Sequence, residues 1–167
     1  MLHLRNVFVK FVFVFALGLF STSIANAQST VYFFMPSTNC WGNGGGVDVY
    51  VNGQNAFSMR GPFKKTIGNV ANPSLPLYVY HAAKRKCVLN EEGKVLFAVD
   101  YKFVTNNGKE SDLTAEIQLN LSEGSVHYVK IEPKGLNDNQ FKELSEKEAA
   151  KLMKDKKYVE LPEYIVQ

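Results

Sequence analysis

The sequence is poor in the residues from which metal sites are built. Its 167 residues include two cysteines and three histidines. A catalytic zinc ion commonly needs three protein ligands and one open position, and the chain has neither an H-E-x-x-H motif nor a cluster of cysteine and histidine. His81 and His127 stand alone in predicted strands. We therefore predict no metal site and no cofactor.

Motifs for catalysis are also missing. The sequence has no G-x-S-x-G elbow, no phosphate loop ending in Lys-Ser or Lys-Thr, and no G-x-G-x-x-G motif. Its neighbouring acids, such as Glu91 with Glu92, fall in a predicted turn or at a helix start, where solvated charge is common. We predict no catalytic residue and interpret the chain as a non-enzyme. An enzyme of unrecognised type, with His81 and His127 as the residues to test, is the least favoured alternative.

The longest uncharged apolar run is short for a membrane span. It extends from Phe11 to about Ile24, whereas a membrane-spanning helix needs roughly 20 apolar residues. Arg5 and Lys10 begin the segment, and Ala25-Asn26-Ala27 end it as a small-x-small cleavage site. This three-part pattern predicts a signal peptide over residues 1–27, cleaved between Ala27 and Gln28. We expect an exported protein, periplasmic or secreted, with no stable membrane anchor after cleavage.

The exported part carries little net charge. The formal charge of the whole chain is +3, and it falls by two units to +1 when Arg5 and Lys10 leave without any acidic residue. A near-neutral domain lacks the field that attracts a polyanion, so we expect neither nucleic acid nor an anionic membrane surface as a partner. The basic run Lys84-Arg85-Lys86 is interpreted as a solvated loop, with an anionic partner as the alternative.

Cys40 and Cys87 both fall in the part predicted to be exported. Disulfides form and persist in oxidising compartments, so we predict that these two cysteines pair. The alternative is a pair of reactive thiols. It has less support, because neither cysteine belongs to a C-x-x-C motif and nothing in the sequence predicts a lowered thiol pKa.

Apolar residues recur with a period of two after residue 28, which is typical of half-buried strands. The clearest runs are Leu113–Leu121, Val95–Phe103 and Val47–Val51. Further strands are predicted at Thr30–Met35, Asn55–Arg60, Leu77–Ala82, Ser125–Glu132 and Tyr158–Leu161. Glycine-containing turn signals, at Asn52-Gly53, Glu92-Gly93, Asn107-Gly108 and Glu123-Gly124, predict hairpins between these runs.

About seven to nine short strands with such turns predict a mainly β, antiparallel two-layer sandwich, since a parallel sheet would need helical crossovers. One helix is predicted at about residues 145–156, because Ser145 and Glu148 form a capping box. Ala149, Leu152 and Met153 share one face of it, so we expect it to pack on the sandwich with its lysines in water. Residues 28–167 are interpreted as one domain.

The segment 40–46 combines the only tryptophan with four glycines. Aromatic rings offer rigid stacking area for a sugar or a peptide, so Trp41, Asn43 and Tyr50 form a candidate binding loop. The alternative is a flexible connection with Trp41 folded over the Cys40 bridge. The segment 62–75 suggests no role.

The order of four stretches resembles a family of small bacterial envelope proteins of unknown function. The stretches are Thr30–Ser37 with its Pro-Ser exit, Val49–Gly53, Leu119–Gly124 and Val126–Lys130. The resemblance implies an immunoglobulin-like β-sandwich and an envelope location, and it brings no active-site residue. Many members are lipoproteins, whereas this chain has no cysteine near the cleavage site for a lipid.

Two functions follow as hypotheses. The first is a non-catalytic envelope module, structural or protein-binding, that contacts an envelope protein through loops or an exposed strand. The second is a binder of small ligands or carbohydrate that uses the candidate loop aromatics.

Overall fold

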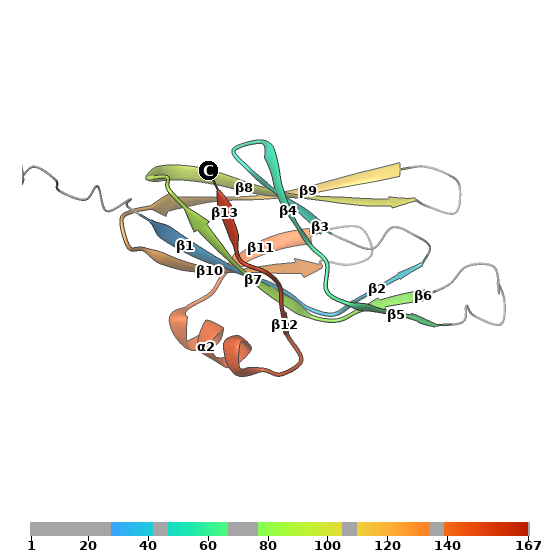
Figure 1. Ribbon diagram of the computed structural model, residues 1–167. Helices are drawn as coiled ribbons and strands as arrows, with labels where there is room; N and C mark the ends of the chain where they lie inside the picture. The colour runs from blue at the N-terminus through green and yellow to red at the C-terminus, as the bar shows by residue number, and fades with distance from the viewer. Residues whose placement is uncertain (1–27, 42–46, 67–76, 105–109, 134–138, 167) are drawn as a thin grey trace, which may run out of the picture.

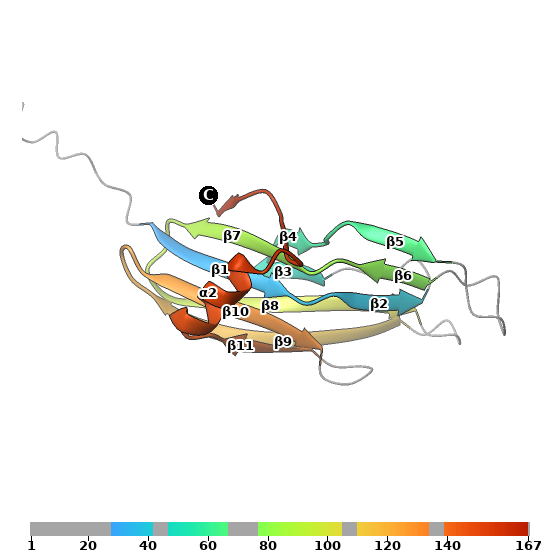
Figure 2. The same cartoon turned by 90° about the horizontal axis from the view of Figure 1, so that it is seen from below.

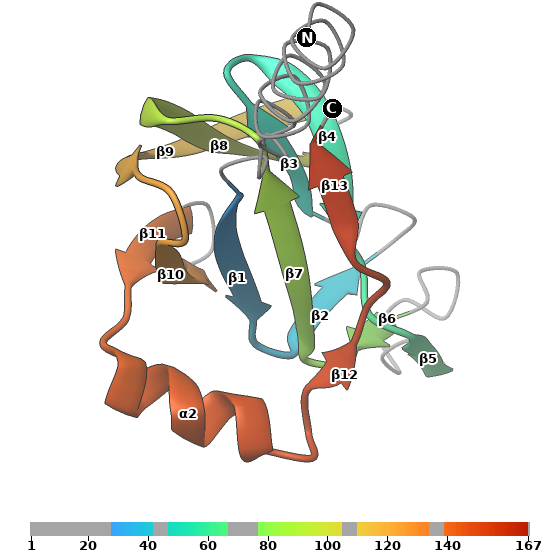
Figure 3. The same ribbon diagram turned by 60° about the vertical axis from the view of Figure 1, so that its left-hand side comes forward.

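A computed structural model of the chain describes residues 28–41, 47–66, 77–104, 110–133 and 139–166. Within these residues, a six-stranded and a four-stranded sheet face each other, and the short helix α2 lies against the outer face of the larger sheet (Figures 1 and 3). The fold is therefore mainly β and sandwich-like, as predicted. The predicted signal peptide, residues 1–27, lies outside the described residues.

The four-stranded sheet has the order β4-β3-β8-β9 and is antiparallel throughout. Its strands are β3 (Val47–Val51), β4 (Gln54–Met59), β8 (Gly93–Val104) and β9 (Glu110–Leu121). The predicted alternation is confirmed, because Val47, Val49, Val51, Val95, Phe97 and Val99 are all buried. Asn52 and Gly53 both have positive φ, 47° and 79°, as the tight turn between β3 and β4 requires.

The six-stranded sheet has the order β11-β10-β1-β7-β12, and β13 also pairs with β7. Its strands are β1 (Ser29–Met35), β7 (Ala83–Leu89), β10 (Val126–Pro133), β11 (Asn139–Glu143), β12 (Val159–Glu160) and β13 (Tyr164–Val166). The prediction of purely antiparallel sheets was wrong here. The chain passes through the other sheet before β10, and through α2 before β12, so it returns parallel to β1 and to β7 respectively.

A three-stranded sheet extends the long axis of the sandwich (Figure 2). It consists of β2 (Thr38–Trp41), β6 (Leu77–Tyr80) and β5 (Phe63–Thr66). β2 follows β1, and β6 precedes β7. Both antiparallel pairs keep one register, since Met35 is opposite Ala83 and Thr38 is opposite Tyr80. The two pairs therefore form one long ladder with a short interruption.

The core lies between the six-stranded and four-stranded sheets and is formed by alternate residues of both. Phe33 from one sheet packs against Phe57 and Phe97 from the other, with ring centroids 5.5 and 5.4 Å apart. A second, smaller cluster lies under the helix, where Phe34, Leu144 and Ala149 are buried. Burial on both faces explains why β1 has apolar residues at adjacent positions.

Helix α2 spans Glu146–Lys154, inside the predicted range. The predicted capping box is confirmed: the Glu148 backbone N–H donates to Ser145 Oγ, and the Ser145 backbone N–H donates to the Glu148 carboxylate. Ala149 is buried, Leu152 and Met153 pack beside it, and the lysines of the helix are exposed. The helix is thus a packed cover, as its apolar stripe predicted.

The strand count and two of the turns differ from prediction. The described residues contain thirteen strands rather than seven to nine, because β2, β5, β7, β11 and β13 were not predicted. Asn52-Gly53 closes a hairpin, and β8 and β9 form another whose turn, with Asn107-Gly108, lies outside the described residues. Gly93 and Gly124 have the expected positive φ, but each lies at a crossing between sheets rather than in a hairpin turn.

Candidate functional site

The predicted Cys40–Cys87 disulfide is not formed in the structure. Cys87 carries a free thiol with no exposed surface. On the long ladder its partner is Val31, nine residues before Cys40, which is itself opposite Tyr78. Nine strand residues span about 30 Å, whereas the Cα atoms of a disulfide lie about 4.4–6.8 Å apart. The predicted export of the chain favoured a disulfide, but the sequence does not reveal the strand register that separates the two cysteines.

Burial makes the Cys87 thiol unreactive. Loss of water around the sulfur raises its pKa to about 12, although the positive charge of Arg85 acts weakly in the opposite direction. A thiol in this state is not a nucleophile. The residue therefore belongs to the core between the sheets rather than to a redox site.

The candidate binding loop is not assembled as one site among the described residues. Trp41 ends β2, but its side chain and all of Asn43 lie outside them. Tyr50 lies at the other end of β3, opposite Asn55 and beside the Asn52-Gly53 turn. Its half-buried side chain is on the outer face of the four-stranded sheet, since Val49 and Val51 face inward.

The two histidines lie in different parts of the fold. His81 is exposed between β6 and β7, where its backbone N–H donates to Pro62 O at 2.9 Å. His127 is in β10, with Nδ1 3.0 Å from Glu143 Oε1. Among the described residues no three histidine, cysteine or carboxylate side chains are close enough to hold a metal ion.

The basic run at residues 84–86 is not a loop, because it forms the middle of β7. Alternation places its side chains on opposite faces. Lys84 Nζ donates to Met153 O at 2.9 Å, at the C-terminal turn of α2, and Lys86 Nζ lies 2.9 Å from Glu163 Oε2. Arg85 points between the sheets, with its guanidinium carbon 5.2 Å from the centroid of the Phe57 ring. These contacts engage the three basic residues within the fold.

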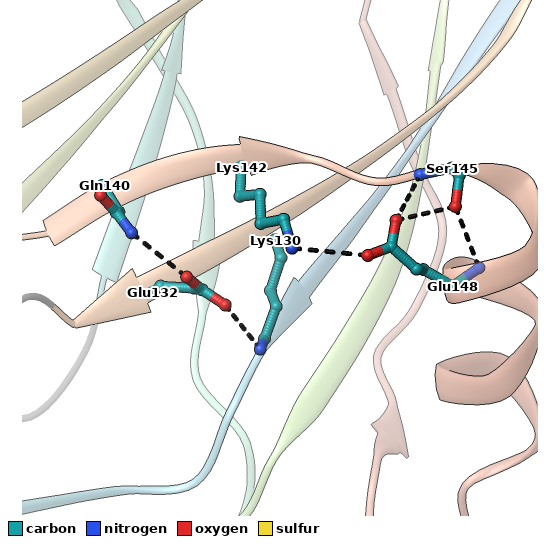
Figure 4. Close-up of polar contacts among 6 residues, drawn as sticks. All are labelled: Lys130, Glu132, Gln140, Lys142, Ser145 and Glu148. Atoms are coloured by element: carbon teal, nitrogen blue, oxygen red, sulfur yellow. Dashed lines mark hydrogen bonds and ion pairs between the residues drawn. The ribbon is translucent and has the colours of Figure 1, made fainter.

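Charged side chains on the outer face near α2 neutralise one another (Figure 4). Glu132 accepts from Lys130 at 2.7 Å and from Gln140 at 3.2 Å, and hydrogen bonding from Lys130 chiefly lowers the pKa of this carboxyl. Lys142 Nζ lies 3.4 Å from Glu148, which also accepts from Ser145. Such pairs fix the helix and strands rather than expose a reactive acid or base.

A groove opens between the edges of the two facing sheets. It lies between β4 and β13 and has a volume of about 680 Å³. Its apolar lining comes from Val51, Ala56, Tyr164, Ile165 and Val166, and its polar lining from Asn52, Gln54, Asn55 and Glu91. Figure 3 shows β13 and β4 next to each other on this side of the sandwich. We refer to this feature as the seam groove.

A β-bulge shapes one wall of the seam groove. Val49 pairs with Phe57 and Tyr50 with Asn55, so Ala56 is left without an opposite residue. A bulge bends its strand and increases the local twist. The bend occurs in the part of β4 that lines the groove, and Phe57 beneath it contacts Tyr164 of β13, with ring centroids 5.1 Å apart. Tyr164, which lines the groove, therefore rests on the buried Phe57 ring.

The polar side of the seam groove is preorganised. Asn52 Nδ2 donates to Glu91 Oε2 at 2.8 Å, and Asn52 Oδ1 accepts from the Leu96 backbone N–H at 3.1 Å. Both ends of the Asn52 side chain are thus fixed. Among the described residues, Glu91 is the one carboxylate that lines the groove. Gln54 and Asn55 are exposed, so this part of the groove offers carboxamides and one negative charge.

The seam groove was missed in the sequence analysis. Asn52, Gln54 and Asn55 form a polar run that marks a turn, and Tyr164 to Val166 follow a proline near the end of the chain. Neither segment indicates that β13 pairs with β7 and so reaches β4. The polar run was the available signal, but its partner strand depends on non-local pairing.

Comparison of the chain with protein-family models, curated proteins and solved structures found no match. Among the described residues, no helix has the length and apolar character needed to cross a membrane.

Proposed function

We propose that the protein is an exported, non-catalytic envelope module with an immunoglobulin-like β-sandwich that binds an extended segment of another envelope protein in the seam groove. The observation that carries the proposal is the groove itself, which combines apolar and carboxamide side chains between two strand edges. The signal-like N-terminal segment and the family resemblance support the envelope location.

An extended peptide fits the dimensions and chemistry of this groove. Among the described strands, β4 pairs only with β3 and β13 only with β7, so each presents an unpaired side. Carboxamides such as those of Gln54 and Asn55 can donate to and accept from peptide groups. The ring of Tyr164, with Val51 and Val166 beside it in the lining, would provide the apolar area that anchors a side chain.

Charge narrows the class of peptide. Glu91 supplies the one carboxylate of the groove within the described residues, and Asn52 holds one of its oxygens in place. An otherwise uncharged segment with one lysine or arginine would complement this charge, whereas an acidic segment would be repelled. The preferred partner is therefore a segment with small apolar residues and a basic residue.

Affinity capture with matched variants tests the proposal. Ala56→Trp would fill the seam groove from its bulged wall, and Asn90→Trp would place the same ring at an exposed position outside it. Captures from cells that export the protein should recover one partner with the wild type and with Asn90→Trp, but not with Ala56→Trp. Equal recovery with all three would exclude the groove as the binding site, provided that circular dichroism shows that each variant is folded.

The polar lining also favours a second candidate, a carbohydrate ligand. Asn, Gln and Glu side chains beside an aromatic ring can hydrogen-bond sugar hydroxyls while the ring stacks on the sugar face. A glycan array followed by melting curves separates the candidates. A glycan that raises the melting temperature of the wild type but not of Ala56→Trp favours this candidate, and a Trp41→Ala effect would favour the candidate loop instead.

A further inference from the structure

Strand β9 ends the four-stranded sheet, where β8 is its one paired neighbour, and β11 of the facing sheet lies near it. It spans twelve residues and pairs with β8 in one unbroken register from Gly93–Leu121 to Val104–Glu110. Its sequence, ESDLTAEIQLNL, contains no proline and no basic residue, and its three charged residues are all acidic. Long, regular edge strands present a row of unpaired N–H and C=O groups that can pair with another chain.

The other edges within the described residues are protected. β4 carries the bulge at Ala56, and β11 has five residues with an exposed Lys142. β12 and β13 have two and three residues and are separated by a segment that contains Pro162. β2 and β5 have four residues each, and β5 contains two lysines. Bulges, short length, lysine and proline are the usual means of preventing edge pairing.

We propose that two copies of the protein pair through β9, antiparallel about a twofold axis, to form one continuous eight-stranded sheet. β9 lies at the end of the four-stranded sheet, so pairing would join two such sheets edge to edge (Figure 2). The inference does not depend on the seam groove, which lies at the opposite edge, beside β4.

The side chains of β9 complement themselves in one register. In an antiparallel pair centred on Ile117, Ala115 faces Leu119 of the other copy and Glu116 faces Gln118. Glu116 and Gln118 are exposed on the outer face, where a carboxylate and a carboxamide form a favourable cross-strand pair. A shift of the centre by one residue to Glu116 would place two carboxylates opposite each other and is disfavoured for that reason.

The test measures self-association of the purified exported chain by analytical ultracentrifugation. One strand pair is a small interface, so we expect a reversible dimer that forms between about 10 µM and about 1 mM. Gln118→Glu would put carboxylates opposite Glu116 at two symmetric sites and should raise the dissociation constant roughly 2- to 30-fold. Gln118→Lys should lower it by a similar factor. Asn90→Asp, an exposed amide-to-acid change outside β9, is the control and should leave it unchanged.

Hydrogen exchange identifies the strand. Amides of β9 should become protected as concentration rises, while those of β4 and β13 keep their rates. A chain that stays monomeric over this range overturns the proposal, including the case in which β9 pairs with a different protein. A dimer that responds equally to Gln118→Glu and Asn90→Asp, or that protects another edge, overturns it as well. Circular dichroism and melting curves verify that each variant is folded, which the exposure of both sites favours.

Discussion

The guanidinium of Arg85 lies over the ring of Phe57, 5.2 Å from its centroid, and connects β7 of one sheet with β4 of the other. Burial lowers the pKa of Arg85, and its Nε has no hydrogen-bond partner among the described residues. The positive charge of Arg85 therefore lies against an aromatic face rather than beside a carboxylate. The same Phe57 ring contacts Tyr164, which lines the seam groove.

Removal of the Phe57 ring should lower the free energy of unfolding far more than removal of the Arg85 charge. Phe57 is buried among aromatic residues, so Phe57→Ala should lower the free energy of unfolding by about 3–5 kcal/mol. Arg85→Met keeps the apolar stem and removes a partly desolvated charge, so it should stay within about 1 kcal/mol of the wild type. Urea denaturation of both variants provides the comparison. An equally large loss for Arg85→Met would mean that the charge itself stabilises the fold.

Cys87 should be protected from alkylation in the folded protein. With a pKa of about 12 instead of 9.0, its thiolate fraction at pH 8 is roughly a thousandfold below that of a free cysteine. We expect iodoacetamide to modify Cys87 in a Cys40→Ser variant only after denaturation. Mass spectrometry of the wild type should find two free thiols, and a loss of two hydrogens before reduction would reveal the bridge that the register excludes.

Loss of the helix cap should weaken the C-terminal part of the fold. Ser145 Oγ accepts from the Glu148 backbone N–H at 3.3 Å, so Ser145→Ala leaves a helix donor without its partner. The expected loss is about 1 kcal/mol in the free energy of unfolding. Ser145→Asp keeps a capping oxygen and should recover most of it. Equal stability of Ser145→Ala and the wild type would show that the cap contributes nothing.

The same cap should make stability depend on pH in the acid range. Hydrogen bonds from Ser145, and then the charge of Lys142, lower the pKa of Glu148 from 4.5 to about 2. Because the folded-state pKa is the lower one, this stabilisation is fully present above about pH 4.5 and is lost as the pH falls towards 2. The difference in melting temperature between the wild type and Glu148→Gln should therefore shrink over that interval. A difference that stays constant down to pH 2 would contradict the role of the carboxylate.

Local patterns predicted the local parts of the fold. The alternation of Val95, Phe97 and Val99 predicted a core face, and Ser145 with Glu148 predicted the helix start, because both signals depend on neighbours in sequence. The course of β7 was missed, since Lys84, Arg85 and Lys86 have the composition of a solvated loop. Their partners, Met153, Phe57 and Glu163, come from distant segments.

The candidate site was hidden for the same reason. The parallel pairing of β1 with β10 and of β13 with β7 depends on how the chain crosses between sheets, which no local pattern records. The register that separates Cys40 from Cys87 is likewise a property of the whole ladder. Polar residues at a turn, such as Gln54 and Asn55, become a binding surface only when β13 lies beside them.

Photo-cross-linking from both walls of the seam groove tests the central claim most directly. A photoreactive residue would replace Asn55 on β4 or the exposed Ile165 on β13, and Lys94 would serve as an exposed control outside the groove. We expect both groove positions to label one extended segment of the same partner protein in cells, and Lys94 to give no such product. Labelling of different proteins from the two walls, or the same product from Lys94, would contradict binding in the seam groove.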